Sequence, residues 1–221
     1  MSNVTSAVDG RIPPGAEGQS EFMLRLLSMV RMIARGGLWF GGGVITAAAL
    51  LIGLDIMLRA GAGMAIDGTD ELARFALAIS TTWALAGALL DRAHIRVDTA
   101  YAQFPGAARL VMDLMGLVAF FIMFGLIFYY GLELISQSWV SAARSTSALQ
   151  IPMVIPQVVW LAGIGVFLMT DLVLLAVALY LIATRRAQAA AVLTGMKSAD
   201  EEVREELLAA DAMHKLGGLS S

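Results

Sequence analysis

The sequence predicts an all-α membrane protein with four transmembrane helices. The first observation is a set of four long apolar segments, each about as long as the 20 residues that a helix needs to cross a bilayer. We expect the spans at about residues 38–58, 71–90, 111–133 and 157–184. The second is the composition: 58% of the residues are hydrophobic and 15% are charged, whereas about a quarter of a soluble domain is charged. Helices are expected because each satisfies its own backbone hydrogen bonds within lipid.

The third observation is that basic residues alternate in number along the segments between the spans. Counted near the ends of the spans, three precede the first span, one follows it, three follow the second, one follows the third, and three follow the fourth. They are Arg25, Arg31 and Arg35; Arg59; Arg92, Arg96 and Arg109; Arg144; and Arg185, Arg186 and Lys197. Because basic residues are enriched in cytoplasmic loops, both termini are expected on the cytoplasmic side.

The segment before the first span divides into two parts. Residues 1–20 are polar and are expected to form a disordered cytoplasmic tail. In residues 21–36, apolar side chains recur at helical spacing and arginines lie on other faces. This pattern favours an amphipathic helix on the inner membrane surface, near anionic lipid, with a bend at Gly36-Gly37. The alternative is a continuous extension of the first span.

The transmembrane domain is predicted to comprise residues 37–185. Gly37 and Gly41 have the GxxxG spacing that lets another helix approach closely. Thr69 is a candidate cap for the second span, and the acidic side chains after it suit the positive end of the helix dipole. Residues 80–83 form a polar patch within that span.

Three further segments complete the prediction. Residues 91–105 place apolar side chains on one helical face, which predicts a short interfacial helix between spans two and three that ends at a proline-glycine pair. The segment 145–156 is uncharged and partly apolar, as is typical of a loop that rests against another protein. The tail 186–221 is expected in the cytoplasm, with an acidic helix at 199–216 that a capping-box pattern introduces.

The chain lacks the residue patterns of an enzyme. It has no cysteine, and its two histidines, His94 and His214, lie outside the spans. A pair of histidines that binds haem between helices is therefore excluded, which disfavours a membrane anchor for an electron-transfer enzyme. A net charge of only −3 argues against nucleic acid as a partner. No cofactor and no metal are expected.

Charged residues within the spans are the remaining candidates. Asp55 and Glu133 lie near the outer ends of their spans, where we expect contact with water. Asp171 lies roughly 20 Å from either end of the fourth span, where a charge costs at least ~2.5 kcal/mol. It is either an ion or proton site, or a structural residue that is protonated or bonded to Thr82, Ser80 or a partner helix. Glu71 and Arg74 share one helical face. They form either a local pair or a docking pair for a second membrane subunit.

A series of residues around the second span and before the fourth stands out by its order and membrane position. It comprises Glu71, Arg74, Trp83, Gly87, Arg92, His94, Asp98, Ser147 and Pro152. This series resembles the DctQ-like family, the small membrane subunit of tripartite ATP-independent periplasmic (TRAP) transporters. The resemblance covers roughly residues 37–185. This sequence departs from the family pattern at Trp160-Leu-Ala-Gly163, because the family often has a second proline just before that glycine.

The resemblance implies a scaffold subunit in the bacterial inner membrane. Its partners would be a large membrane subunit, which carries the solute sites, and a periplasmic solute-binding protein. Such systems import organic acids with a sodium gradient instead of ATP, and the residues of the series would contact the partners. The resemblance places solute recognition in the other chains, so this sequence does not specify the solute. The alternative hypothesis is a self-sufficient small transporter or channel that acts as a homo-oligomer through Asp171.

Overall fold

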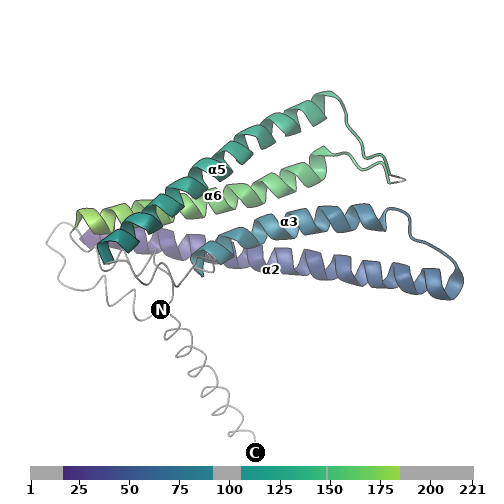
Figure 1. Ribbon diagram of the computed structural model, residues 1–221, viewed down its shortest axis with the longest axis horizontal. Coiled ribbons are helices and arrows are strands. Elements are labelled where there is room, and N and C mark those ends of the chain that lie inside the picture. Colours follow the sequence, from purple (N-terminus) through teal and green to yellow (C-terminus); the bar gives the residue numbers. More distant parts are fainter. Residues whose placement is uncertain (1–16, 92–105, 148, 185–221) are drawn as a thin grey trace, which may run out of the picture.

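The computed structural model describes residues 17–91, 106–147 and 149–184. It confirms an all-helical fold with four helices that are long and apolar enough to cross a membrane. In chain order they are α2 (Glu17–Ala62), α3 (Thr69–Leu90), α5 (Gly106–Val140) and α6 (Val154–Ala183) (Figure 1). In this described part of the chain, the only extended pairing is an isolated bridge between Arg144 and Pro152.

The observed helices contain nearly all of each predicted span and extend beyond most of them. The clearest difference is in α2, which runs from Glu17 to Ala62 without a break. Residues 21–36 therefore form the first part of α2, with no interruption at Gly36-Gly37, and their expected position on the membrane surface stays a prediction. Glycine permits a bend but does not require one, and Gly37 is packed against the backbone of Trp83. At 1.5 Å per residue, α2 is about 69 Å long, roughly twice the hydrocarbon thickness.

Several predictions concern residues outside the described ranges. The interfacial helix expected in residues 92–105, most of the tail 1–20 and the C-terminal tail with its acidic helix belong to this group. So do three residues of the candidate interface, namely Arg92, His94 and Asp98. The cytoplasmic position of the termini also stays a prediction.

The four helices form two hairpins. α2 and α3 are joined by residues 63–68, and α5 and α6 by residues 141–153, which we call the α5–α6 loop. α3 packs against both α2 and α6, while α5 packs against α6, so the helices follow the order α2, α3, α6, α5. Figure 1 shows the hairpins diverging toward these two connections, at what we call the hairpin end. The opposite end, where α2 begins and α6 finishes, is the terminal end.

Two apolar clusters hold the terminal end together. One joins α2 to α6 through Val30, Val173, Val177 and Leu181. The other joins α3, α5 and α6 through Leu89, Leu117, Phe167 and Leu174. The ring of Phe167 lies 4.4 Å from that of Phe124, measured between centroids. Because lipid is as apolar as these side chains, the clusters stabilise the helix pairs mainly by close packing.

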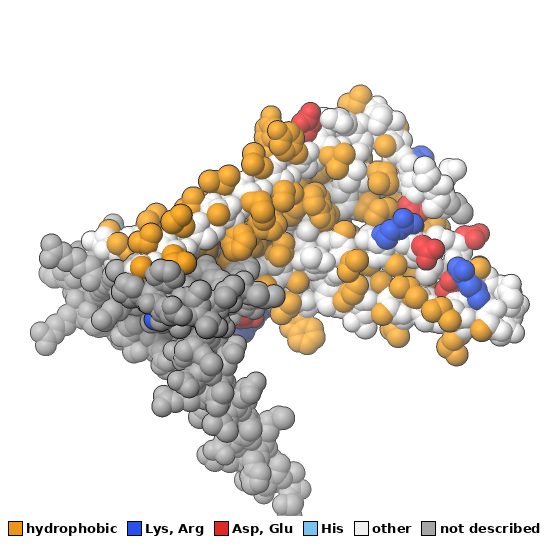
Figure 2. Space-filling model, in the orientation of Figure 1, with side chains coloured by type: hydrophobic (Ala, Val, Ile, Leu, Met, Phe, Trp, Pro, Cys, Tyr) orange, Lys and Arg blue, Asp and Glu red, His pale blue; other side chains and the backbone are white. Residues whose placement is uncertain are grey.

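The surface separates apolar from charged side chains. Apolar side chains cover the visible faces of α5 and α6, whereas most of the visible charges gather over α2 and α3 near the hairpin end (Figure 2). Large exposed apolar residues occur along all four helices, as expected for surfaces that face lipid or another membrane subunit.

Candidate partner interface and the contacts that position it

The GxxxG pair of α2 marks a close contact with α3. A Cβ atom added to Gly41 would lie 2.8 Å from the carbonyl oxygen of Ser80, and one added to Gly37 would lie 2.9 Å from that of Trp83. Both distances are shorter than real Cβ contacts, so any larger side chain would push the helices apart. The sequence motif therefore serves a contact within the chain.

Trp83 lies where α2, α3 and α6 meet. Its indole Nε1–H donates a hydrogen bond to the carbonyl oxygen of Val159 in α6, at 2.9 Å. Its ring meets Phe40 of α2 edge-on, with 4.9 Å between ring centroids. A Cβ atom added to Gly163 would lie 2.9 Å from Cδ1 of Trp83, so α6 approaches this side chain closely. Trp83 thus ties three helices of this chain together.

The α5–α6 loop is folded back on itself. The backbone N–H of Ser145 donates to the carbonyl of Ile151 at 2.9 Å, and that of Met153 donates to Ala143 at 3.0 Å. Gln150 has a positive φ of 46°, which a non-glycine residue rarely adopts. These bonds give the loop a defined shape and present Pro152 on its exposed side.

The α5–α6 loop is also attached to the start of α3. The hydroxyl of Ser147 donates a hydrogen bond to the carboxylate of Glu71, which is buried. Leu149 packs directly on Gly68, the N-cap of α3, whose φ is 84°. A side chain at Gly68 would clash with Leu149 and would strain the backbone. The two hairpins are thus joined at the hairpin end as well as at Trp83.

The other predicted interface residues take different positions. Arg74 is exposed, and its Nε–H donates to the backbone carbonyl of Asp70 at 3.1 Å. Glu71 and Arg74 therefore have separate hydrogen-bond partners. Gly87 is buried against Leu38 of α2, whose nearest side-chain atom lies 3.7 Å from the Cβ position.

Asp55 corrects another expectation. The sequence places it near the end of a span, where we expected contact with water, but the structure buries it. One carboxylate oxygen accepts the backbone N–H of Ile66 at 2.6 Å, and the other pairs with Arg59 at 2.9 Å. Asp55 thus fixes the connection between α2 and α3.

Asp171 is fully buried, and neither carboxylate oxygen has a hydrogen-bond partner among the described residues. The expected donors are used elsewhere. The hydroxyls of Ser80 and Thr82 donate to backbone carbonyls three or four residues earlier in α3. Thr170, beside Asp171, likewise donates to the carbonyl of Val166 at 2.8 Å. The expected hydrogen bond from Ser80 or Thr82 to Asp171 is therefore not formed.

Sequence reasoning missed three positions at which the structure buries a group or brings two elements close together. Gly163 permits the close approach of α6 to α3, and Gly68 receives Leu149. Asp113 is buried in α5, although it directly precedes a segment free of charge. Only the glycine at 163 carried a signal, because small residues within a span favour helix contacts.

One comparison with known proteins places this chain in a family. A family model described as "Tripartite ATP-independent periplasmic transporters, DctQ component" matches residues 48–190, which is more than half of the chain. The matched range contains α3, α5 and α6, both connections and the contacts of Trp83 with α6. Comparisons with curated proteins and with solved structures gave no match. The chain belongs to the DctQ component family of TRAP transporters and is a small permease subunit.

Proposed function

We propose that this subunit is a scaffold in the bacterial inner membrane. It braces the large membrane subunit and helps to dock the periplasmic solute-binding protein while an ion gradient drives uptake of an organic acid. Both termini lie in the cytoplasm, and the hairpin end faces the periplasm. The family supports a place in such a transporter, and the following contacts support the scaffold role.

One observation carries the proposal: Asp171 apart, the buried polar side chains that the structure shows between α3 and its neighbours bind this chain's own backbone or loops. Trp83 donates to a carbonyl of α6, Glu71 accepts from Ser147, and the hydroxyls of Ser80 and Thr82 donate within α3. A solute path needs polar groups that are free to bind the solute. The hydroxyls of Ser80 and Thr82 are occupied within α3, while Trp83 and Glu71 fix α3 to α6 and to the α5–α6 loop, which is what a brace requires.

The candidate interface residues then divide into two kinds. Glu71, Trp83 and Gly87 are enclosed within the chain and position its helices. Arg74 and Pro152 are exposed at the hairpin end, where we propose that they contact the partners. Ser147 attaches the loop that carries Pro152. Arg92, His94 and Asp98 remain proposed contacts on the cytoplasmic side.

Copurification with the large subunit tests the proposal. The small subunit is co-expressed with an affinity-tagged large permease from a neighbouring gene, and the ratio of the two chains is measured after purification in mild detergent. Arg74→Ala is expected to lower recovery of the small subunit about fivefold, the effect of losing roughly 1 kcal/mol at an interface. Arg35→Ala, which removes an exposed arginine from the terminal end, is the control and is expected to leave the ratio unchanged.

An equal ratio for Arg74→Ala and the wild type would remove Arg74 from the interface. Failure of the wild-type chains to copurify would overturn the scaffold proposal itself. A homo-oligomer of this chain that moves solute into liposomes without a partner would instead favour the hypothesis that centres on Asp171, the buried carboxylate with no bound partner group among the described residues.

A further inference from the structure

The last part of α2 extends beyond the other helices at the hairpin end. Gly41 lies against the backbone of Ser80, which fixes the register of α2 against α3. Thr69, the first residue of α3, precedes Ser80 by 11 residues, so it lies level with Ile52, 11 residues after Gly41. Residues 53–62 of α2 therefore continue about 15 Å past the start of α3. Figure 1 shows α2 reaching further at this end than α3, α5 and α6.

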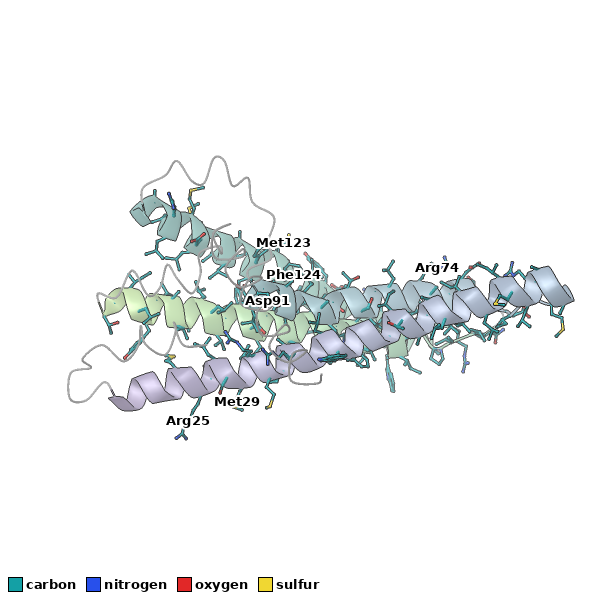
Figure 3. All side chains as sticks on the ribbon, turned by 90° about the horizontal axis from the view of Figure 1, so that it is seen from below. Arg25, Met29, Arg74, Asp91, Met123 and Phe124 are labelled. Atoms are coloured by element: carbon teal, nitrogen blue, oxygen red, sulfur yellow. The ribbon has the colours of Figure 1, made fainter. Side chains whose placement is uncertain are left out.

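This protruding part of α2 lies outside the hydrocarbon layer. α3 has 22 residues, or about 33 Å of helix, which matches the roughly 30 Å of that layer. Its first turn carries Asp70, which is exposed. The α5–α6 loop turns at the same level, because Leu149 packs on Gly68. Figure 3 shows α2 continuing well past Arg74, which lies one turn beyond Asp70 in α3.

Apolar side chains are exposed on this protrusion, which we call the α2 tip and define as residues 53–68. Leu54, Ile56, Met57 and Met64 are 51%, 60%, 73% and 65% exposed. Leu54 and Met57 are three residues apart, so they share one helix face, and Ile56 adjoins Met57. A single exposed apolar residue needs no explanation, but a group of them outside lipid indicates a protein-binding surface.

The α2 tip has a defined shape. One carboxylate oxygen of Asp55 accepts the backbone N–H of Ile66 at 2.6 Å, and the other pairs with Arg59 at 2.9 Å. The hydroxyl of Thr69 donates to the carbonyl of Ile66 at 2.9 Å. Gly63 has a φ of 65°, which glycine adopts without strain. Because these contacts already order the tip, a partner that binds it loses less free energy to ordering.

A water-soluble protein fits this surface better than a membrane subunit does. The tip lies beyond the layer in which transmembrane helices pack against one another. Its edge is polar, because the side chain of Arg59 is 56% exposed and Asp67 is also exposed. An apolar centre with a polar rim is the usual composition of a protein–protein interface, and methionine side chains adapt to the shape of a partner.

We propose that the α2 tip docks the periplasmic solute-binding protein, with Leu54, Ile56, Met57 and Met64 against an apolar patch of that protein. The inference rests on the proposed function, which places the hairpin end in the periplasm and includes this partner. It assigns the docking to a specific surface that the sequence did not single out. The tip stands about 15 Å clear of α3, so it reaches a soluble partner before the rest of the subunit does.

Single cysteines test the depth of the tip, because the sequence contains no cysteine. The small and large subunits are purified together, placed in lipid nanodiscs and labelled with a membrane-impermeant maleimide, and labelling of this chain is followed by mass spectrometry. Leu77, eight residues after the start of α3, is 59% exposed at the level of the layer. Met57→Cys is expected to react on the order of tenfold faster than Leu77→Cys, since the reactive thiolate forms in water.

The same labelled position tests docking. The solute-binding protein is added at ten times its dissociation constant, so by mass action about one complex in eleven stays free. Labelling of Met57→Cys is therefore expected to slow by about tenfold. The small subunit alone, in nanodiscs without the large subunit, is expected to show the same unprotected rate at this position as the two-chain complex.

Two double variants at opposite ends of α2 form a matched pair. Met57→Gln/Met64→Gln makes the tip more polar, whereas Met29→Gln/Met32→Gln changes two methionines near the terminal end that are 56% and 70% exposed. Figure 3 shows Met29 pointing away from the other helices. Surface plasmon resonance measures the dissociation constant of the solute-binding protein for each complex. The tip variant is expected to raise it on the order of tenfold, or about 1.4 kcal/mol, and the terminal-end variant to leave it unchanged.

Equal labelling rates of Met57→Cys and Leu77→Cys would overturn the position of the tip outside lipid. Labelling of Met57→Cys that the solute-binding protein does not slow, or an unchanged dissociation constant for Met57→Gln/Met64→Gln, would overturn the docking site. Slower labelling in the two-chain complex than in the small subunit alone would show that the tip contacts the large subunit instead. These results come from complexes that have already copurified, so they leave the scaffold proposal intact. Failure of the wild-type chains to copurify would remove that proposal and this inference with it.

Discussion

Gly41→Ala and Gly42→Ala form a matched pair of substitutions on adjacent residues of α2. A Cβ atom at Gly41 would lie 2.8 Å from the carbonyl oxygen of Ser80 and 3.3 Å from its Cα, whereas one at Gly42 would meet nothing within 4 Å. Both changes add one methyl group, and both raise the helix propensity of α2 by the same amount. They differ only in the contact that the methyl group makes with α3.

The difference in stability follows from that contact. An ordinary van der Waals contact begins at 3.4 Å, so α2 and α3 must separate locally by roughly 0.6 Å to admit the methyl group at Gly41. Overpacking of this kind costs about 1–3 kcal/mol, while replacement of glycine by alanine in a helix contributes up to about 1 kcal/mol in both variants. Gly41→Ala is therefore expected to be about 1–3 kcal/mol less stable than Gly42→Ala.

Unfolding in detergent micelles measures this difference. The purified chain is titrated with sodium dodecyl sulfate, and helix content is followed by circular dichroism, which is independent of the environment of Trp83. Gly42→Ala is expected at or above the wild-type midpoint and Gly41→Ala below it. Equal midpoints for the two variants, or a higher midpoint for Gly41→Ala, would refute the close crossing of α2 and α3.

Three further predictions follow from single contacts. Trp83→Phe removes the hydrogen bond to Val159, so the same titration is expected to show a loss of about 0.5–1.5 kcal/mol; an unchanged midpoint would count against this tie. Glu71→Gln and Ser147→Ala are expected to couple by about 0.5–3 kcal/mol in a double-mutant cycle, and strict additivity would argue against their contact. Asp171→Asn removes a possible buried charge, so stability and solute uptake by the assembled transporter are expected to persist; complete loss of uptake at normal expression would indicate an ion or proton site.

The helices were predictable because the signal for each is local. A run of about 20 apolar residues specifies a span without reference to the rest of the chain, and the predicted spans lie almost wholly within α2, α3, α5 and α6. The spacing of Gly37 and Gly41 also signalled a close helix contact. It did not identify α3 as the partner, since a small residue permits approach from any helix.

The contacts between helices were not predictable in the same way. Trp83 and Val159 are 76 residues apart in the sequence, as are Glu71 and Ser147. Such pairs depend on the register of one helix against another, which no local pattern encodes. Trp83 therefore looked equally suited to a partner subunit. Asp55 was misjudged for the same reason, because its partner, the N–H of Ile66, is a backbone group without a sequence signature.

The two ties between the hairpins have a consequence for the proposed docking surface. Without the tie at Glu71, the hairpins would be joined only at Trp83 and at the apolar clusters nearer the terminal end. The second lies at Glu71, 12 residues from Trp83 along α3, or about 18 Å away, so together they fix the angle between α3 and α6. Arg74 lies between these points on an exposed part of α3, and Pro152 lies on the loop that the second tie holds. The relative position of these proposed partner contacts therefore depends on buried bonds within the subunit, so a substitution at Glu71 or Trp83 is expected to weaken assembly although neither side chain is proposed to touch the partner.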